Sequence, residues 1–269
     1  MNIGFIGIGS MGDMLVRTLL RSGVLAPKEA WLANRSRAKL DALTIHSPGI
    51  HTVSCPQVAA NCDLIFVCVG AEDIAGVLEQ MDAELRPGQL LVTTTPAVGL
   101  KALEDRVPCR VATLIPSITQ EIGGGVALLM YGSRVTTEDR RLLENLLGHV
   151  SQPIAITESL ARPTIGLASG GPALFAYILQ SMAQEAVRSN PELSPELAWK
   201  LVQETAAATT RLFSEANMTT EETIRRVAVP GGMTALAIEV LSRYVPKAWQ
   251  AVFRETAGRE TKAVKSLVL

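Results

Sequence analysis

Apolar residues in the first part of the chain follow two alternating patterns. Short runs rich in Ile, Val, Leu and Phe, typical of buried strands, are separated by stretches in which apolar residues recur at helical spacing. Between the first two runs, Met14, Leu15 and Leu19 have helical spacing, and Gly23 is placed to end the helix. This alternation predicts a parallel sheet covered by helices. The expected strands are 2–8, 30–34, 51–54, 63–69, 90–95, 110–116 and 126–132.

After about residue 160 the pattern is helical throughout. The stretch 165–187 is apolar on nearly every side, which predicts one helix that is buried on most of its faces. The next helix has Ser194 as a candidate N-cap and Pro195 as its first residue, and the last helix shows the same pattern from Pro246. Residues 158–164 are expected to form a short hinge.

The change of pattern predicts two domains. We expect an α/β Rossmann domain over 1–160, followed by an all-α domain over 161–269 for substrate binding and dimerisation. The second domain has too few helices of its own to cover the apolar stretch 165–187 within one chain. Because a second copy would cover it, we expect a homodimer formed through the C-terminal helices.

Composition narrows the function classes. The 269 residues are 48% hydrophobic and carry a formal net charge of -1 with no basic block, which argues against binding to nucleic acid or to an anionic membrane. The longest apolar runs have strand length, and the N-terminus lacks the basic region of a secretion signal. Four cysteines without C-x-x-C spacing indicate reduced thiols in a cytoplasmic protein. No cluster of acids has the spacing of metal ligands, so no bound metal is expected.

The pattern G-x-G-x-x-G occurs at residues 7–12, "GIGSMG", directly after the first strand and before a helix. In that position Gly7 allows a tight turn, Gly9 lets the backbone approach a pyrophosphate, and Gly12 lets helix and strand pack closely. The N–H groups at the start of the helix would face the phosphates. Dinucleotide binding is therefore favoured over a glycine-rich structural turn. The expected contacts are Gly7, Ile8, Gly9, Ser10, Met11 and Gly12.

The end of the second strand bears on the choice of nicotinamide cofactor. An NAD enzyme usually carries an acid there for the ribose hydroxyls. In this chain Asn34, Arg35 and Ser36 occupy the place, and no acid follows until Asp41. A guanidinium and a hydroxyl suit a 2′-phosphate, which favours NADP over NAD. The alternative is that Ser36 serves only as the N-cap of the next helix.

A second motif lies in the helical part, "RVAVPGGMTALAIEVL" at 226–241. Pro230, Gly231 and Gly232 interrupt its apolar pattern, although a helix interior disfavours Pro by about 3 kcal/mol and each Gly by about 1 kcal/mol. The two glycines would leave the N–H groups of the following helix bare, and Thr234 would add a hydroxyl, which together suit an anion. A plain corner between two helices is the alternative.

Two other classes of reductase fit the chain less well. The β-hydroxyacid dehydrogenases share the opening "IGFIGIGSMG" but carry a catalytic lysine on the first helix after the dinucleotide domain, and 163–187 contains no Lys. A metal-dependent ketol-acid isomeroreductase would need acidic ligands at suitable spacing on the helices, which this sequence lacks.

Five motifs together resemble those of pyrroline-5-carboxylate reductases. "GFIGIGSMG", "ANRS", "LIPSITQEIGGGVALL", "SGGPALFAYIL" and "VPGGMTALAIEVL" have the order and spacing of that family over essentially the whole chain. The stretch "VPCRVATLIPSIT" most resembles a divergent branch, the late-competence proteins of the ComE operon. The resemblance implies an oxidoreductase of proline biosynthesis that reduces 1-pyrroline-5-carboxylate with NADPH. A protonated imine accepts hydride readily, so such an enzyme needs few ionisable residues.

The resemblance also implies where the ligands bind. It places the substrate carboxylate at the Pro-Gly-Gly-x-Thr turn, with Thr234 as the catalytic residue. The expected substrate-binding residues are Gly231, Gly232, Met233, Thr234 and Ser117. The expected cofactor site, besides the glycine loop and Asn34, Arg35 and Ser36, includes Val69, Gly70, Ala71, Thr94, Thr95 and Pro96.

The chain departs from the family pattern around the substrate. Ala228, Val229 and Met233 stand where the family sequence Val-Thr-Ser-Pro-Gly-Gly-Thr-Thr has hydroxyls, and "PSIT" replaces Pro-Asn-Thr-Pro. Each lost hydrogen bond costs roughly 1 kcal/mol or more. Two alternatives therefore stay open: a reductase of a different small acid, and a non-catalytic NADP-binding regulatory protein.

Overall fold

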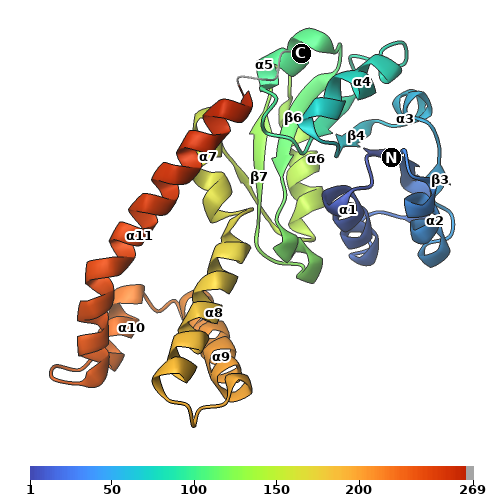
Figure 1. Ribbon diagram of the computed structural model, residues 1–269. Coiled ribbons are helices and arrows are strands. Elements are labelled where there is room, and N and C mark those ends of the chain that lie inside the picture. Colours follow the sequence, from blue (N-terminus) through green and yellow to red (C-terminus); the bar gives the residue numbers. More distant parts are fainter. Residues whose placement is uncertain (265–269) are drawn as a thin grey trace. The chain divides into compact units, whose positions relative to one another are not determined.

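The N-terminal part of the chain forms an eight-stranded sheet in the computed structural model, which describes residues 1–264 and the side chains of residues 1–256 (Figure 1). The strand order is β3-β2-β1-β4-β5-β6-β7-β8, and every neighbouring pair is parallel except β6 and β7. The strands are β1 (Ile3–Ile6), β2 (Ala30–Ala33), β3 (His51–Thr52), β4 (Leu64–Val67), β5 (Leu90–Thr93), β6 (Arg110–Ile115), β7 (Val126–Tyr131) and β8 (Gln152–Ala155).

The seven expected strands are confirmed, but the sheet differs from the prediction at its last two strands. The prediction of a wholly parallel sheet is wrong at β7, which runs antiparallel to β6. Only the short 3₁₀ helix η2 (Ile118–Ile122) lies between them, and a parallel pair would need a longer crossover connection. The sequence does not predict β8, because its Pro153 and exposed Ile154 do not give an alternating pattern. It is one of the two edge strands, where proline is tolerated because one side of the strand forms no ladder.

Helices cover both faces of the sheet. On one face α1, α2 and α6 pack against a core that includes the stacked rings of Phe5 and Phe66, whose centroids are 5.2 Å apart. On the other face α3, α4 and α5 pack against a second core, which includes Ile65 and Val111. The helices are α1 (Ser10–Arg21), η1 (Pro27–Glu29), α2 (Arg37–His46), α3 (Cys55–Asn61), α4 (Ala71–Met81), α5 (Leu100–Arg106), α6 (Thr137–Gly148), α7 (Glu158–Leu167), α8 (Gly171–Ser189), α9 (Pro195–Ser214), α10 (Thr220–Val227) and α11 (Met233–Val264).

Three helix predictions change in the structure. The single helix expected over 165–187 is wrong, because the chain breaks between α7 and α8 at a run that ends in two glycines. The expected hinge at 158–164 forms most of α7, with Pro163 inside the helix. The last helix does not begin at Pro246 but runs through it from Met233. The start of α9 is confirmed, since the Ser194 hydroxyl accepts a hydrogen bond from the Leu197 N–H.

The chain divides into two compact units. The first unit includes Met1–Pro172 and the second unit is Ala173–Arg259. The helix α7 lies in the first unit, where Ala161 and Ile165 pack against the second core of the sheet. The expected domain boundary after residue 160 stays a prediction.

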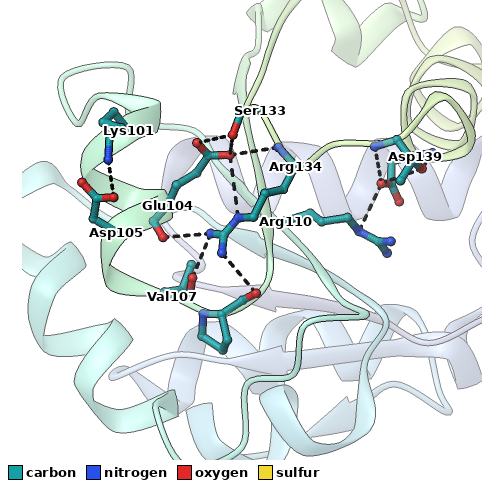
Figure 2. Close-up of polar contacts among 10 residues, drawn as sticks. Lys101, Glu104, Asp105, Val107, Arg110, Ser133, Arg134 and Asp139 are labelled. Carbon is teal, nitrogen blue, oxygen red and sulfur yellow. Dashed lines mark hydrogen bonds and ion pairs between the residues drawn. The ribbon is translucent and has the colours of Figure 1, made fainter.

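A network of polar contacts fastens α5 to the turn after β7 within the first unit (Figure 2). The carboxylate of Glu104 accepts hydrogen bonds from the Ser133 hydroxyl at 3.0 and 3.1 Å and from the Arg134 N–H at 3.1 Å. The Arg134 guanidinium donates in turn to three carbonyl oxygens just after and at the end of α5, those of Glu104, Val107 and Pro108. These bonds satisfy backbone carbonyls that the end of a helix leaves without partners.

The second unit consists of helices, and its large apolar side chains are mostly exposed. Among its described residues only Ala183 and Ala198 are buried. No described helix is both long and apolar enough to cross a membrane. The exposed large apolar residues of this unit are Phe175, Tyr177, Ile178, Met182, Leu197, Trp199, Leu201, Leu212, Ile224, Val227, Val229, Met233, Leu236, Val240, Leu241, Tyr244, Val245 and Phe253.

Candidate functional site

A pocket of about 530 Å³ opens in the first unit where the strand order reverses around β1. The connections that follow β1, β2, β3 and β4 all lie at the carboxyl edge of the sheet, because these strands are parallel. Ligands of open α/β sheets bind at this edge. The pocket is lined by Ile6, Gly7, Gly9, Ala33, Asn34, Arg35, Lys39, Val53, Ser54, Cys55, Cys68, Val69, Gly70, Glu72, Asp73, Gly76, Val77 and Gln80.

The glycine loop has the geometry of a phosphate cradle. Gly7 has a φ of +92°, which L side chains rarely adopt. A Cβ on Gly12 would lie 2.1 Å from the Gly7 carbonyl oxygen, so this glycine is needed for close packing of α1 on the loop. A Cβ on Gly9 would meet nothing within 4 Å, so the backbone of this pocket-lining glycine is open to close approach. Each glycine therefore has the local environment expected for its part in dinucleotide binding.

The first turn of α1 offers backbone donors to that cradle. Gly9 is the N-cap and has no side chain to accept hydrogen bonds, and the first backbone bond of the helix runs from the Asp13 N–H to the Gly9 carbonyl. The N–H groups of Ser10, Met11 and Gly12 precede that bond, so the helix supplies no acceptor for them. Bare amides at a helix N-terminus fit the phosphates of a dinucleotide.

The loop after β2 forms one wall of the pocket. The Asn34 side chain accepts a hydrogen bond from the Ile8 N–H at 2.9 Å, so it shapes the glycine loop. Arg35 lines the pocket with its side chain 88% exposed, and its guanidinium forms an ion pair with Asp73 at 2.8 Å. Ser36 is the N-cap residue of α2, but its side chain makes no capping hydrogen bond. The hydroxyl is thus not used in the way that the N-cap alternative requires.

The expected cofactor residues after β4 and β5 lie next to each other. The Thr95 hydroxyl donates to the Val69 carbonyl at 2.7 Å, which ties the two strand ends together. Val69 and Gly70 line the pocket; Ala71 begins α4, and Thr94 and Pro96 flank Thr95. Burial raises the pKa of the neighbouring Cys68 thiol to about 12, so this group is a neutral thiol at physiological pH.

Several pocket residues were not predicted from the sequence. Ser54 and Cys55 follow β3, and their place after a strand in a parallel sheet was a usable signal. Glu72 and Asp73 belong to the first turn of α4. They bring two carboxylates to a pocket in which no acid was expected, because the sequence motif concerns only the end of β2.

Ser117 lies at the end of β6, in the first unit and apart from the other expected substrate residues in sequence. Its side chain is buried. The Ser117 hydroxyl accepts a hydrogen bond from the Thr119 hydroxyl at 2.9 Å and donates one to the Ala168 carbonyl at 3.4 Å. Its hydroxyl is therefore engaged in holding the β6–η2 turn and the end of α7 together. Its assignment to substrate binding stays a prediction.

The glycine turn of the second unit ends one helix and begins the next, as expected. Gly231 has a φ of +79° between α10 and α11, and the first backbone bond into α11 runs from the Leu236 N–H to the Gly232 carbonyl. The N–H groups of Met233, Thr234 and Ala235 come before that bond and have no acceptor within the helix. The Thr234 side chain is exposed at the same turn. The second unit therefore has, at the start of α11, the kind of bare amides to which anions can bind.

Two family models match the two parts of the chain. Residues 2–97 match the model described as NADP oxidoreductase, coenzyme F420-dependent. Residues 158–263 match the model for pyrroline-5-carboxylate reductase dimerisation. The predicted order of a Rossmann domain and a helical dimerisation domain is confirmed.

Individual proteins match nearly the whole chain. Pyrroline-5-carboxylate reductase 3 of Bacillus subtilis is 31% identical, over 94% of this chain and 93% of its own. ComE operon protein 4 of the same organism is 30% identical, over 95% and 94%. The solved pyrroline-5-carboxylate reductase of Coxiella burnetii is 25% identical, with a TM-score of 0.85 over 100% of this chain and 98% of that one.

Proposed function

The chain belongs to the pyrroline-5-carboxylate reductase family, and we propose that it is an NADPH-dependent oxidoreductase that reduces 1-pyrroline-5-carboxylate to proline. The observation that carries the proposal is the second set of bare amides, at the start of α11. The first unit already has a cradle for a dinucleotide, so a separate anion site fits a small substrate that bears a carboxylate.

The proposed reaction adds a hydride to the carbon of the C=N bond and a proton to its nitrogen. NADPH, when bound, would supply the hydride and become NADP⁺, and water would supply the proton; the match to an NADP oxidoreductase model supports this choice of cofactor. The amides of Ser10, Met11 and Gly12 would hold the pyrophosphate, and Arg35 with Ser36 would hold the 2′-phosphate. The amides at the start of α11 and the Thr234 hydroxyl would hold the substrate carboxylate. The chain's own part in this chemistry is binding and orientation.

We further propose a homodimer formed through the C-terminal helices. The match to a dimerisation model over 158–263 supports it, as does the exposure of apolar side chains such as Phe175 and Met182 on α8. The cytoplasmic location expected from the cysteines stays a prediction; all four are unpaired.

Two observations favour functions other than pyrroline-5-carboxylate reduction. ComE operon protein 4 matches the chain about as well as the reductase does, and Ala228, Val229 and Met233 bring no hydroxyls to the glycine turn. A non-catalytic NADP-binding regulatory protein, or a reductase of a different small acid, would fit these substitutions. The bare amides of α11 nevertheless favour the reductase.

The decisive experiment is to mix the protein with NADPH and 1-pyrroline-5-carboxylate and to follow both the absorbance of reduced nicotinamide and the formation of proline. We expect NADPH to be consumed as proline appears in equal amount. Binding of NADPH without consumption with any cyclic imino acid would support the regulatory alternative. Consumption with another small acid only would support the other reductase.

The carboxylate site is tested by Thr234→Ala. Loss of a hydrogen bond to a charged group should raise KM for the imino acid, or lower kcat/KM, by roughly tenfold. Thr209→Ala is the control, since the hydroxyl of this half-buried residue donates to a carbonyl of its own helix. Unchanged kinetics of Thr234→Ala, at an unchanged Kd for NADPH, would place the carboxylate elsewhere.

A further inference from the structure

The ion pair between Arg35 and Asp73 lies inside the proposed cofactor pocket. Arg35 comes from the loop after β2, and Asp73 from the first turn of α4, so the pair spans the pocket wall between two elements. The Arg35 Nη2 atom lies 2.8 Å from the Asp73 Oδ2 atom. The Arg35 side chain is 88% exposed and that of Asp73 is 34% exposed. Arg35 is therefore held by one contact while most of its surface faces solvent.

The charges around this pair balance. Arg35 and Lys39 bring two positive charges to the pocket, and Glu72 and Asp73 bring two negative ones. A 2′-phosphate brings up to two more negative charges to the guanidinium that Asp73 already contacts. The phosphate therefore has to compete with a carboxylate for Arg35, and it is repelled by that carboxylate when both are near. A ribose that carries only hydroxyls meets neither obstacle.

We propose that Asp73 is a specificity-determining residue for the cofactor. Its carboxylate holds Arg35 when no 2′-phosphate is bound and competes with that phosphate for the guanidinium. The pair thus lowers the preference for NADPH over NADH below the value that Arg35 alone would give. This role rests on the proposed function, in that it takes the pocket to be the nicotinamide cofactor site.

The test measures Kd for NADPH and for NADH by fluorescence titration of the wild-type protein and of Asp73→Asn. Asparagine keeps the shape of the side chain and removes its charge. We expect the ratio of Kd for NADH to Kd for NADPH to rise by roughly threefold to tenfold, mainly through tighter binding of NADPH. Added salt should narrow the difference between the two proteins, because the pair is exposed.

Two further variants isolate the pair. Asp41→Asn removes an equally simple carboxylate that pairs with Arg37 at 2.9 Å on α2 and does not line the pocket, so the ratio should not change. In an Arg35→Gln background, Asp73→Asn should change the ratio by less than about twofold, since the competing partner is gone.

Any of the following outcomes would show that Asp73 does not determine cofactor specificity in this way. An unchanged or lowered ratio in Asp73→Asn would show that the carboxylate does not compete with the phosphate. An equal rise in Asp41→Asn, or an undiminished rise in the Arg35→Gln background, would show a general effect of charge. A wild-type protein that binds neither nucleotide would overturn the proposed function as well, whereas the other results leave it standing.

Discussion

The two units of the chain use similar apolar side chains in opposite ways. In the first unit Phe66 is fully buried and stacked on Phe5 between sheet and helices. In the second unit Phe175 is 63% exposed, and it shares one face of α8 with Ile178 and Met182, which are also exposed. The first unit thus completes its hydrophobic core within one chain. The second unit has the apolar surface of a core without the second layer that would bury it.

The polar contacts also tie the first unit together more than the second. The ion pairs of the second unit, such as Arg211 with Glu215 and Arg243 with Glu239, join exposed residues one turn apart on a helix and contribute little. In the first unit, Glu104 is 11% exposed and joins elements distant in sequence (Figure 2). We therefore expect the first unit to be stable by itself and the second to depend on association.

The largest expected effect is on the buried core. Phe66→Ala should lower the free energy of unfolding by about 3–5 kcal/mol, because it removes a fully buried ring and leaves a cavity. Urea denaturation measures this free energy from the unfolding transition of the first unit. The control, Phe175→Ala, should leave that transition unchanged while it weakens self-association. If both variants lower the same transition equally, the two units are not independent and the comparison fails.

The next effect is on association. Phe175→Asp places a charge on the exposed apolar face of α8 and should raise the dimer dissociation constant by roughly thirtyfold or more. Sedimentation at several protein concentrations measures it. Glu185→Gln, an exposed change on the same helix, is the control. A wild-type chain that sediments as a monomer at micromolar concentration would rule out the proposed homodimer.

The smallest effect sharpens the comparison within the first unit. Glu104→Gln should cost about 1 kcal/mol of unfolding free energy, because the charge that strengthens the hydrogen bonds to this side chain is lost at a nearly buried site. Asp105→Asn, next to it but exposed and paired only with Lys101, should cost less than about 0.5 kcal/mol. Equal costs would show that the network adds no stability beyond that of a surface pair.

Much of the fold could be predicted because the first unit follows local rules. Its buried strands are continuous apolar runs, and apolar residues recur at helical spacing between them, so the sequence predicts seven of its strands. The pattern failed where tertiary context overrides local preference. β8 is an exposed edge strand with a proline, and α11 continues through Pro246 although proline disfavours a helix interior.

The candidate site divides in the same way. The glycine loop and the turn before α11 could be read from the sequence, because their function needs glycine at fixed places in the backbone. Asp73 could not, since its partner Arg35 lies 38 residues away in sequence and only the packing of α4 brings them together. Nor could the burial of Ser117, which depends on the end of α7.

The helix α7 has two affiliations. The dimerisation model of the family begins at residue 158, so in sequence the helix belongs to the C-terminal domain. By packing it belongs to the Rossmann unit, where Ile165 covers the sheet and the Glu158 carboxylate accepts the Leu100 N–H at the start of α5 at 2.8 Å. A gene fusion or truncation that cuts the chain before residue 158 would remove α7 from the nucleotide-binding unit and expose the part of the sheet that it covers. A cut between the two glycines before Pro172 would leave α7 on the sheet. The better site for dividing this chain therefore lies about one helix after the boundary of the family model.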